Sequence, residues 1–125
     1  MHLPPKIDSG NIEYKLKMTT SNKLYLIKQS THLKIRCNNG RGMAIYLIGV
    51  NDSGDILGIN SKEFKSTLDN LQKIVDINQG MILQKTVNQL EGGKFWATIF
   101  ILDHDINKDL VTTTTYTFNN NLMTD

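Results

Sequence analysis

The stretch GMAIYLIGVNDSGDILGIN, residues 42–60, is the part of this chain from which its fold is most readily deduced. An apolar run from Met43 to Val50 precedes the turn segment NDSG, and a shorter run from Asp55 to Ile59 follows it. Two short runs separated by Asn, Asp, Ser and Gly are typical of a β-hairpin, because these residues adopt positive φ or bond their own backbone. The residues expected at its turns and close-packed positions are Gly40, Gly42, Gly49, Asp52, Gly54 and Gly58.

A strand and a helix are expected before this hairpin. Residues 11–18 alternate between apolar and polar side chains, which predicts a strand with Ile12 and Tyr14 on its buried face and Lys15 and Lys17 on its wet face. Residues 23–38 carry apolar or small residues at helical spacing, namely Leu26, Ser30, Leu33 and Cys37. The segment NNG at 38–40 ends this helix, with Gly40 expected in the left-handed conformation.

A second helix and two or three strands are expected after the hairpin. Asn60 or Ser61 caps the helix, Glu63 completes a capping-box pattern, and its buried stripe is Phe64, Leu68, Leu71 and Val75. Residues 81–90 alternate, residues 91–93 form a turn, and 94–102 (KFWATIFIL) are rich in strand-forming residues. Residues 111–118 (VTTTTYTF) are a further candidate for an edge strand.

This order of elements predicts an α+β fold. The expected plan is the split βαβ, ferredoxin-like arrangement, β-α-β-β-α-β with one or two extra C-terminal strands and helices on one face of a mainly antiparallel sheet. We expect one domain over residues 1–118, with 119–125 as a frayed tail.

Composition favours a globular protein of a reducing compartment. The chain has 125 residues, of which 39% are hydrophobic and 21% charged, and a single cysteine, Cys37, which excludes an internal disulfide. It has no apolar run of the ~20 residues that a bilayer span needs and no signal-peptide pattern at its start. A cytoplasmic location is therefore expected. The abundance of Asn, Ile, Lys and Thr hints at an AT-rich genome, which is found in some viruses.

The charge is unevenly distributed. Residues 1–42 hold eight Lys or Arg against two acids, a net charge of +6, whereas residues 43–125 hold six against ten, a net charge of −4. Such asymmetry fits a one-sided contact with phosphate groups or an acidic partner, and it also fits a solvated face.

Motifs for catalysis are missing from the sequence. Gly92-Gly93-Lys94 is followed by Phe95 and so is not a phosphate-binding loop, and no dinucleotide fingerprint exists. The triplet DHD at 103–105 offers too few ligands for a metal site. Cys37 lies among basic residues that could lower its pKa, but its place on the helix's apolar stripe favours a core position. We expect no catalytic residues, no metal and no cofactor.

Two segments carry a specific resemblance. GNIEYKLKM at 10–18 and LKIRCNNGRGMAIYLIGVNDSGDILGINSKEF at 33–64 resemble the N-terminal domain of the elongation-factor-like GTP-binding protein one/two family of translational GTPases. The matching residues are Gly10, Asn11, Glu13, Tyr14, Lys15, Lys17, Lys34, Arg36, Gly40, Gly42, Ala44, Tyr46, Gly49, Asp52, Gly54 and Gly58. Met43, Ile35 and Cys37 depart from the family's Glu, aromatic residue and Leu. The resemblance extends over about residues 4–104, and the hairpin alone also looks like the Alba-like domain of Schlafen-type proteins.

The resemblance implies a recognition role without GTP chemistry. In the family, a G domain follows this module, and the present chain has no counterpart of that domain, so no GTP binding is expected of this chain alone. We expect a non-enzymatic module that binds RNA, the ribosome or a translation GTPase through its basic half. The residues expected to contact RNA or a partner are Lys15, Lys17, Lys28, Lys34, Arg36 and Arg41.

Two alternatives remain open. The chain could be a protein-protein adaptor or homo-oligomer that uses the 94–102 and 111–118 strands as edges for strand addition. It could also be a metal-dependent nuclease, for which Asp52, Asp55, Asp103 and Asp105 are the candidate carboxylates.

Overall fold

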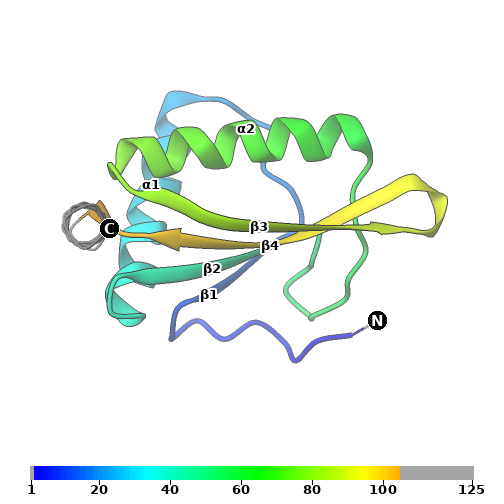
Figure 1. The fold of residues 1–125 in the computed structure, drawn as a ribbon, viewed down its shortest axis with the longest axis horizontal. Helices are drawn as coiled ribbons and strands as arrows, with labels where there is room; N and C mark the ends of the chain where they lie inside the picture. Colours follow the sequence, from blue (N-terminus) through cyan, green and yellow to red (C-terminus); the bar gives the residue numbers. More distant parts are fainter. Residues whose placement is uncertain (1, 105–125) are drawn as a thin grey trace, which may run out of the picture.

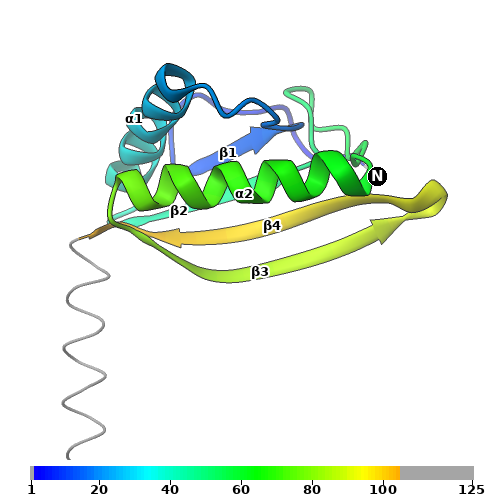
Figure 2. The ribbon, with the colours of Figure 1, turned by 90° about the horizontal axis from the view of Figure 1, so that it is seen from above.

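The computed structural model describes residues 2–104 and shows two helices packed on one face of a four-stranded sheet (Figures 1 and 2). The elements in chain order are β1 (Ile12–Lys15), α1 (Lys23–Asn39), β2 (Met43–Ile48), α2 (Ser61–Ile77), β3 (Met81–Leu90), a short 3₁₀ turn (Glu91–Gly93) and β4 (Lys94–Leu102). The predicted α+β class is confirmed, and the arrangement is consistent with a ferredoxin-like split βαβ fold.

The sheet has the strand order β1-β2-β4-β3. β1 runs parallel to β2, and the other two pairings are antiparallel, which is the mainly antiparallel sheet that the sequence predicts. In Figure 2 both helices lie on the same side of the sheet. Because β1 and β3 stand at the two ends of the strand order, they are the edge strands within the described residues.

α1 begins and ends close to its predicted bounds, and α2 begins where its predicted cap places it. In α1 the Asn22 side chain accepts a hydrogen bond from the Tyr25 amide at 3.2 Å, which caps the helix, and the four predicted stripe residues are all buried. In α2 the Asn60 side chain accepts from the Glu63 amide at 2.8 Å. Phe64, Leu71 and Val75 of the predicted stripe are buried, whereas Leu68 is only partly buried.

The hairpin at 42–60 has one regular arm. β2 forms the first arm, and Val50 pairs with Ile56 across the predicted turn. The Asn51 side chain accepts from the amides of Ser53 and Asp55, so the turn bonds its own backbone as expected. The second arm is not a strand, because its residues make isolated bridges to different partners, including Ile59 to Phe95 of β4. This accounts for the observed order β-α-β-α-β-β instead of β-α-β-β-α-β.

The first strand is shorter than predicted, and its burial pattern differs. Only Ile12–Lys15 pair with β2. Ile12 is exposed, contrary to the prediction, and Glu13, which by alternation should share the wet face of Lys15 and Lys17, is buried. The burial of Glu13 follows from Arg36 of α1, which neutralises the Glu13 carboxylate inside the fold.

The C-terminal strands correct one further prediction. KFWATIFIL forms β4, which pairs with β2 on one side and β3 on the other, so it is a central strand and not an edge. β4 is central because its alternate residues Ala97, Ile99 and Ile101 are fully buried beneath the helices. The second proposed edge, residues 111–118, and the tail at 119–125 lie outside the described residues.

Two glycines of the hairpin region are required by close backbone approach. A Cβ on Gly49 would lie 2.9 Å from the Phe95 carbonyl oxygen, and Gly49 also has φ +85°. A Cβ on Gly40 would clash with the Met43 carbonyl and the Asn11 side chain. Gly40 itself is not left-handed, since its φ is −109°, and the positive φ angles fall on Arg41 and Gly42 instead.

Neither helix of the described part has the length and hydrophobicity that crossing a bilayer requires.

Candidate nucleic-acid interface

A polar pocket of about 290 Å³ lies between the N-terminal segment, β1 and α1. It is lined by Lys6, Asp8, Glu13, Lys15, His32, Ile35 and Arg36. Two of the six predicted contact residues, Lys15 and Arg36, meet here. We call this set of residues the β1–α1 pocket.

Arg36 is the structural centre of the β1–α1 pocket. Its side chain is buried and donates hydrogen bonds of 3.0–3.2 Å to four successive carbonyl oxygens of residues 7–10. Its Nε atom also lies 3.4 Å from Glu13 Oε2. A guanidinium used in this way fastens the N-terminal segment to α1, and each of its three nitrogens already donates to an acceptor of the fold.

Glu13 is held between two cations. Besides Arg36, the Lys6 amine lies 3.3 Å from Glu13 Oε1 and 3.5 Å from Asp52 Oδ1. Burial disfavours the charged form of Lys6, but Glu13 and Asp52 together outweigh it and raise its pKa. Lys6 therefore remains a cation at neutral pH, and it neutralises the acids around it.

Lys15 is the third Lys or Arg of the pocket, and unlike Arg36 and Lys6 it is not paired with a carboxylate within residues 2–104. It projects from the end of β1, is half-buried, and has no ion-pair or hydrogen-bond partner within residues 2–104. Burial lowers its pKa from the ordinary 10.5, since the amine loses hydration that no carboxylate fully replaces. An anion entering the pocket would restore favourable charge at this position.

The exposed face of α1 extends this cationic region. Lys28 is exposed and lies four residues before His32, so the two side chains share one face of the helix. The sequence of α1, residues 23–39, contains four basic and no acidic residues. The helix thus places His32 in the pocket with Lys15 and Lys28 one turn before His32, without a carboxylate of its own.

The remaining predicted contact residues lie elsewhere. Lys17 is bonded to Glu63 at 2.6 Å, and Lys34 is bonded to both carboxylate oxygens of Asp103 at 2.9 and 3.0 Å. Arg41 is exposed in the turn that follows α1. The structure therefore does not bring all six predicted residues together.

Two basic residues of the pocket, Lys6 and His32, are not among the predicted contacts. Lys6 lies 46 residues before Asp52 of the hairpin turn but is bound to it, because its amide donates to the Asp52 carbonyl at 2.8 Å. The Leu3 amide likewise donates to the Gly54 carbonyl at 2.7 Å, so the hairpin turn holds the N-terminal segment in place. No local sequence pattern signals this long-range contact.

The structure lends no support to the candidate nuclease carboxylates. Among residues 2–104, no three His, Cys, Asp or Glu side chains are grouped as metal ligands. Asp52 and Asp55 lie in the hairpin turn, Asp103 is paired with Lys34, and Asp105 is outside the described residues. Burial, and then the charge of Asp103, raise the pKa of Cys37 to about 11, so this thiol is not activated at neutral pH.

Comparisons with known proteins identify relatives over part of the chain. GTP-binding protein 2 from Mus musculus and from Homo sapiens is 37% identical over 75 residues, which cover 60% of this chain and 12% of that protein. The Uncharacterized protein R625 of Acanthamoeba polyphaga mimivirus is 32% identical over 107 residues, 82% of this chain and 58% of the viral protein. No family model matches the chain, and no solved structure matches it. A 75-residue segment of this chain is therefore related to a small part of GTP-binding protein 2.

Proposed function

We propose that this chain is a non-enzymatic, RNA-binding module of the translation apparatus, and that the β1–α1 pocket with the adjoining face of α1 contacts RNA phosphates. The observation that carries the proposal is the half-buried amine of Lys15, which lacks a partner within residues 2–104 and lines the β1–α1 pocket together with His32. Phosphate oxygens are the anions that lysine amines bind most often in nucleic-acid complexes.

The relationship to GTP-binding protein 2 supports a translation-related role but does not extend to GTP chemistry. The matched segment is 12% of that protein's length, and the present chain has no phosphate-binding loop sequence. We therefore propose that the module recognises a partner and takes no part in GTP binding or hydrolysis.

Ribosome co-sedimentation at increasing salt tests the proposal. The unchanged chain should pellet with ribosomes at low salt and be released as the salt concentration rises, because each phosphate contact displaces bound counterions. The double variant Lys15→Gln/Lys28→Gln should be released at a lower salt concentration.

A matched control is available on the other helix. Lys62 and Lys73 are exposed on α2, and the double variant Lys62→Gln/Lys73→Gln removes the same charge from a different surface. It should pellet like the unchanged chain. A chain that does not pellet even at low salt, or two double variants that behave alike, would exclude the proposed surface.

A further inference from the structure

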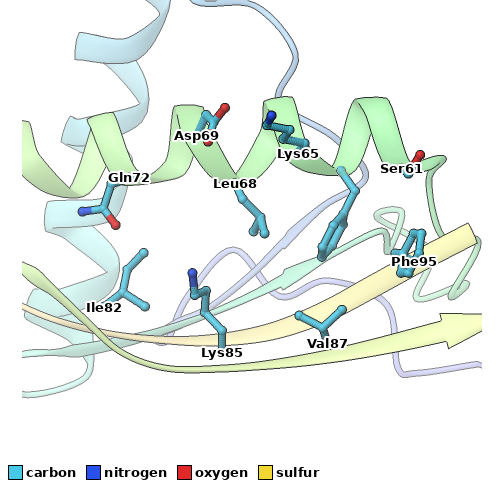
Figure 3. A pocket seen from close by; sticks show the side chains of 10 residues that line it. Ser61, Lys65, Leu68, Asp69, Gln72, Ile82, Lys85, Val87 and Phe95 are labelled. Atoms are coloured by element: carbon cyan, nitrogen blue, oxygen red, sulfur yellow. The ribbon is translucent and has the colours of Figure 1, made fainter.

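A groove of about 430 Å³ runs between α2 and the edge strand β3, on the helix face of the sheet (Figure 3). It is lined by Ser61, Phe64, Lys65, Leu68, Asp69, Gln72, Ile82, Lys85, Val87 and Phe95. These residues come from one face of α2, from β3 and from the start of β4. None of them lines the β1–α1 pocket, so the groove is a separate surface, which we call the α2–β3 groove.

The floor of the α2–β3 groove is apolar. At one end the rings of Phe64 and Phe95 stack with their centroids 5.5 Å apart. Figure 3 shows Leu68 pointing from α2 toward β3, where Val87 is 49% exposed. An exposed β-branched side chain beside partly buried aromatic and aliphatic residues provides apolar surface that a partner can cover.

A β-bulge in β3 creates this lining. The register with β4 shifts between Ile82 and Gln84, which leaves Leu83 as the extra residue. Without the bulge, Ile82 and Lys85 would face opposite sides of the sheet, since side chains alternate along a strand. With it, Ile82, Lys85 and Val87 all line the groove.

β3 also offers a backbone edge. It is ten residues long and pairs with β4 alone within residues 2–104, so its outer side faces no other described strand. Such an edge can accept an added strand through main-chain hydrogen bonds, while alternate side chains of the added strand reach the neighbouring groove.

The charges that line the groove indicate which kind of strand can bind there. Lys65 from α2 and Lys85 from β3 both line the groove, and neither has an ion-pair partner within residues 2–104. Asp69 is the one acid in the lining. Lys85 is also the sole charged residue of β3, so the β3 strand of a second copy has no acid to place against Lys65 and Lys85. The complementary occupant is therefore an acidic strand and not a second copy of this chain.

We propose that the α2–β3 groove binds an extended segment of a partner protein that adds to the outer edge of β3, and that every second residue of this segment, on the side that faces the groove, is apolar and acidic in turn. The apolar residues cover Leu68, Val87 and the Phe64–Phe95 pair, and the acidic residues meet Lys65 and Lys85. This surface is independent of the RNA contact, so either proposal can fail without the other.

Peptide titrations followed by amide NMR test the proposal with the full-length chain. The probe is a capped nine-residue peptide with Val, Glu, Val, Glu and Val at its odd positions and Thr at its even positions, and the control peptide has Lys in place of Glu. We expect the Glu peptide to shift amide signals of β3 and of the groove face of α2. The Lys peptide should leave them unchanged.

Charge reversal distinguishes this site from other surfaces. The double variant Lys65→Glu/Lys85→Glu should bind the Glu peptide at least about tenfold more weakly and should gain binding of the Lys peptide. Lys62→Glu/Lys73→Glu carries the same charge change outside the groove and should bind the Glu peptide within about twofold of the unchanged chain.

Four results would overturn the proposal. They are no shifts at millimolar peptide, shifts confined to another surface, binding unaffected by reversal at Lys65 and Lys85, and protection of the outer β3 amides in the free chain. If that protection grows with protein concentration, a second copy of the chain occupies the edge. If it does not, the chain's own residues beyond 104 occupy it.

Discussion

Arg36 of α1 and Glu13 of β1 face each other inside the fold, with Nε 3.4 Å from Oε2, and both side chains are only 6–7% exposed. The same guanidinium binds the carbonyl oxygens of residues 7–10. One side chain thus joins the helix, the first strand and the N-terminal segment, and these three elements form the walls of the β1–α1 pocket.

Replacing Arg36 should therefore destabilise the fold strongly. Arg36→Met leaves the Glu13 carboxylate buried with only Lys6 nearby, and we expect the free energy of unfolding to fall by about 3–5 kcal/mol. Urea denaturation measures this change. Arg41→Met, at an exposed position, should change the free energy of unfolding by less than about 0.5 kcal/mol. Equal stability of the two variants would show that the buried pair has no structural role.

The close contact at Gly49 gives a second stability prediction. Gly49→Ala places a Cβ 2.9 Å from both the Phe95 carbonyl oxygen and the Trp96 Cβ, at a φ of +85°. Gly92 has a similar φ of +82° with nothing within 4 Å, so Gly92→Ala measures the backbone strain alone. We expect Gly92→Ala to cost about 1–2 kcal/mol and Gly49→Ala at least about 2 kcal/mol more. Thermal or urea unfolding of the two variants that shows the same loss would contradict the close approach.

The N-cap of α2 gives a third stability prediction. Asn60→Ala removes the 2.8 Å bond to the Glu63 amide and should lower the free energy of unfolding by about 1 kcal/mol. Asn60→Asp retains an acceptor at the same position and should stay close to the unchanged chain. An alanine variant as stable as the aspartate variant would mean that the cap does not stabilise α2.

Cys37 gives the chain a specific response to alkaline pH. Burial, and then the charge of Asp103, raise the pKa of its thiol from 9.0 to about 11. Between these values the unfolded thiol loses its proton while the folded thiol keeps it, so stability falls as the pH rises. The loss attributable to Cys37 should reach about 2 kcal/mol near pH 11.

Urea denaturation at pH 8 and pH 10.5 checks this response. Cys37→Ala removes the titrating group and should make the dependence of stability on pH less steep over this interval. If the unchanged chain and Cys37→Ala lose the same stability between the two pH values, the thiol is not perturbed in the folded protein.

The sequence predicts the helices of this fold better than its first and third strands. The two helices are evident because their caps and apolar stripes are local, as at Asn60 and Glu63. β1 is misread because the partner that buries Glu13 is Arg36, which lies 23 residues away along the chain. In β3, strict alternation would put Ile82 and Lys85 on opposite faces, whereas the bulge at Leu83 brings both to the groove, and a bulge of this kind has no local signature without Gly.

The candidate site, like the strands, can be predicted only in part from the sequence. Lys15 could be singled out by its place in a basic segment, but its half-buried position depends on the packing of β1 against α1. Lys17, Lys34 and Arg36 belong to the same basic segment, yet the fold pairs each of them with a carboxylate. A count of charges along the sequence cannot distinguish these paired cations from Lys15.

The salt dependence of RNA binding by Lys15→Gln is the most direct test of the proposed function. Fluorescence anisotropy with a labelled single-stranded RNA gives the dissociation constant over a range of salt concentrations, and the slope of its logarithm against log salt reports the number of phosphates neutralised. We predict that Lys15→Gln weakens binding and reduces this slope by about one contact, whereas Lys62→Gln leaves both unchanged. A slope for Lys15→Gln equal to that of the unchanged chain would contradict a phosphate contact in the β1–α1 pocket.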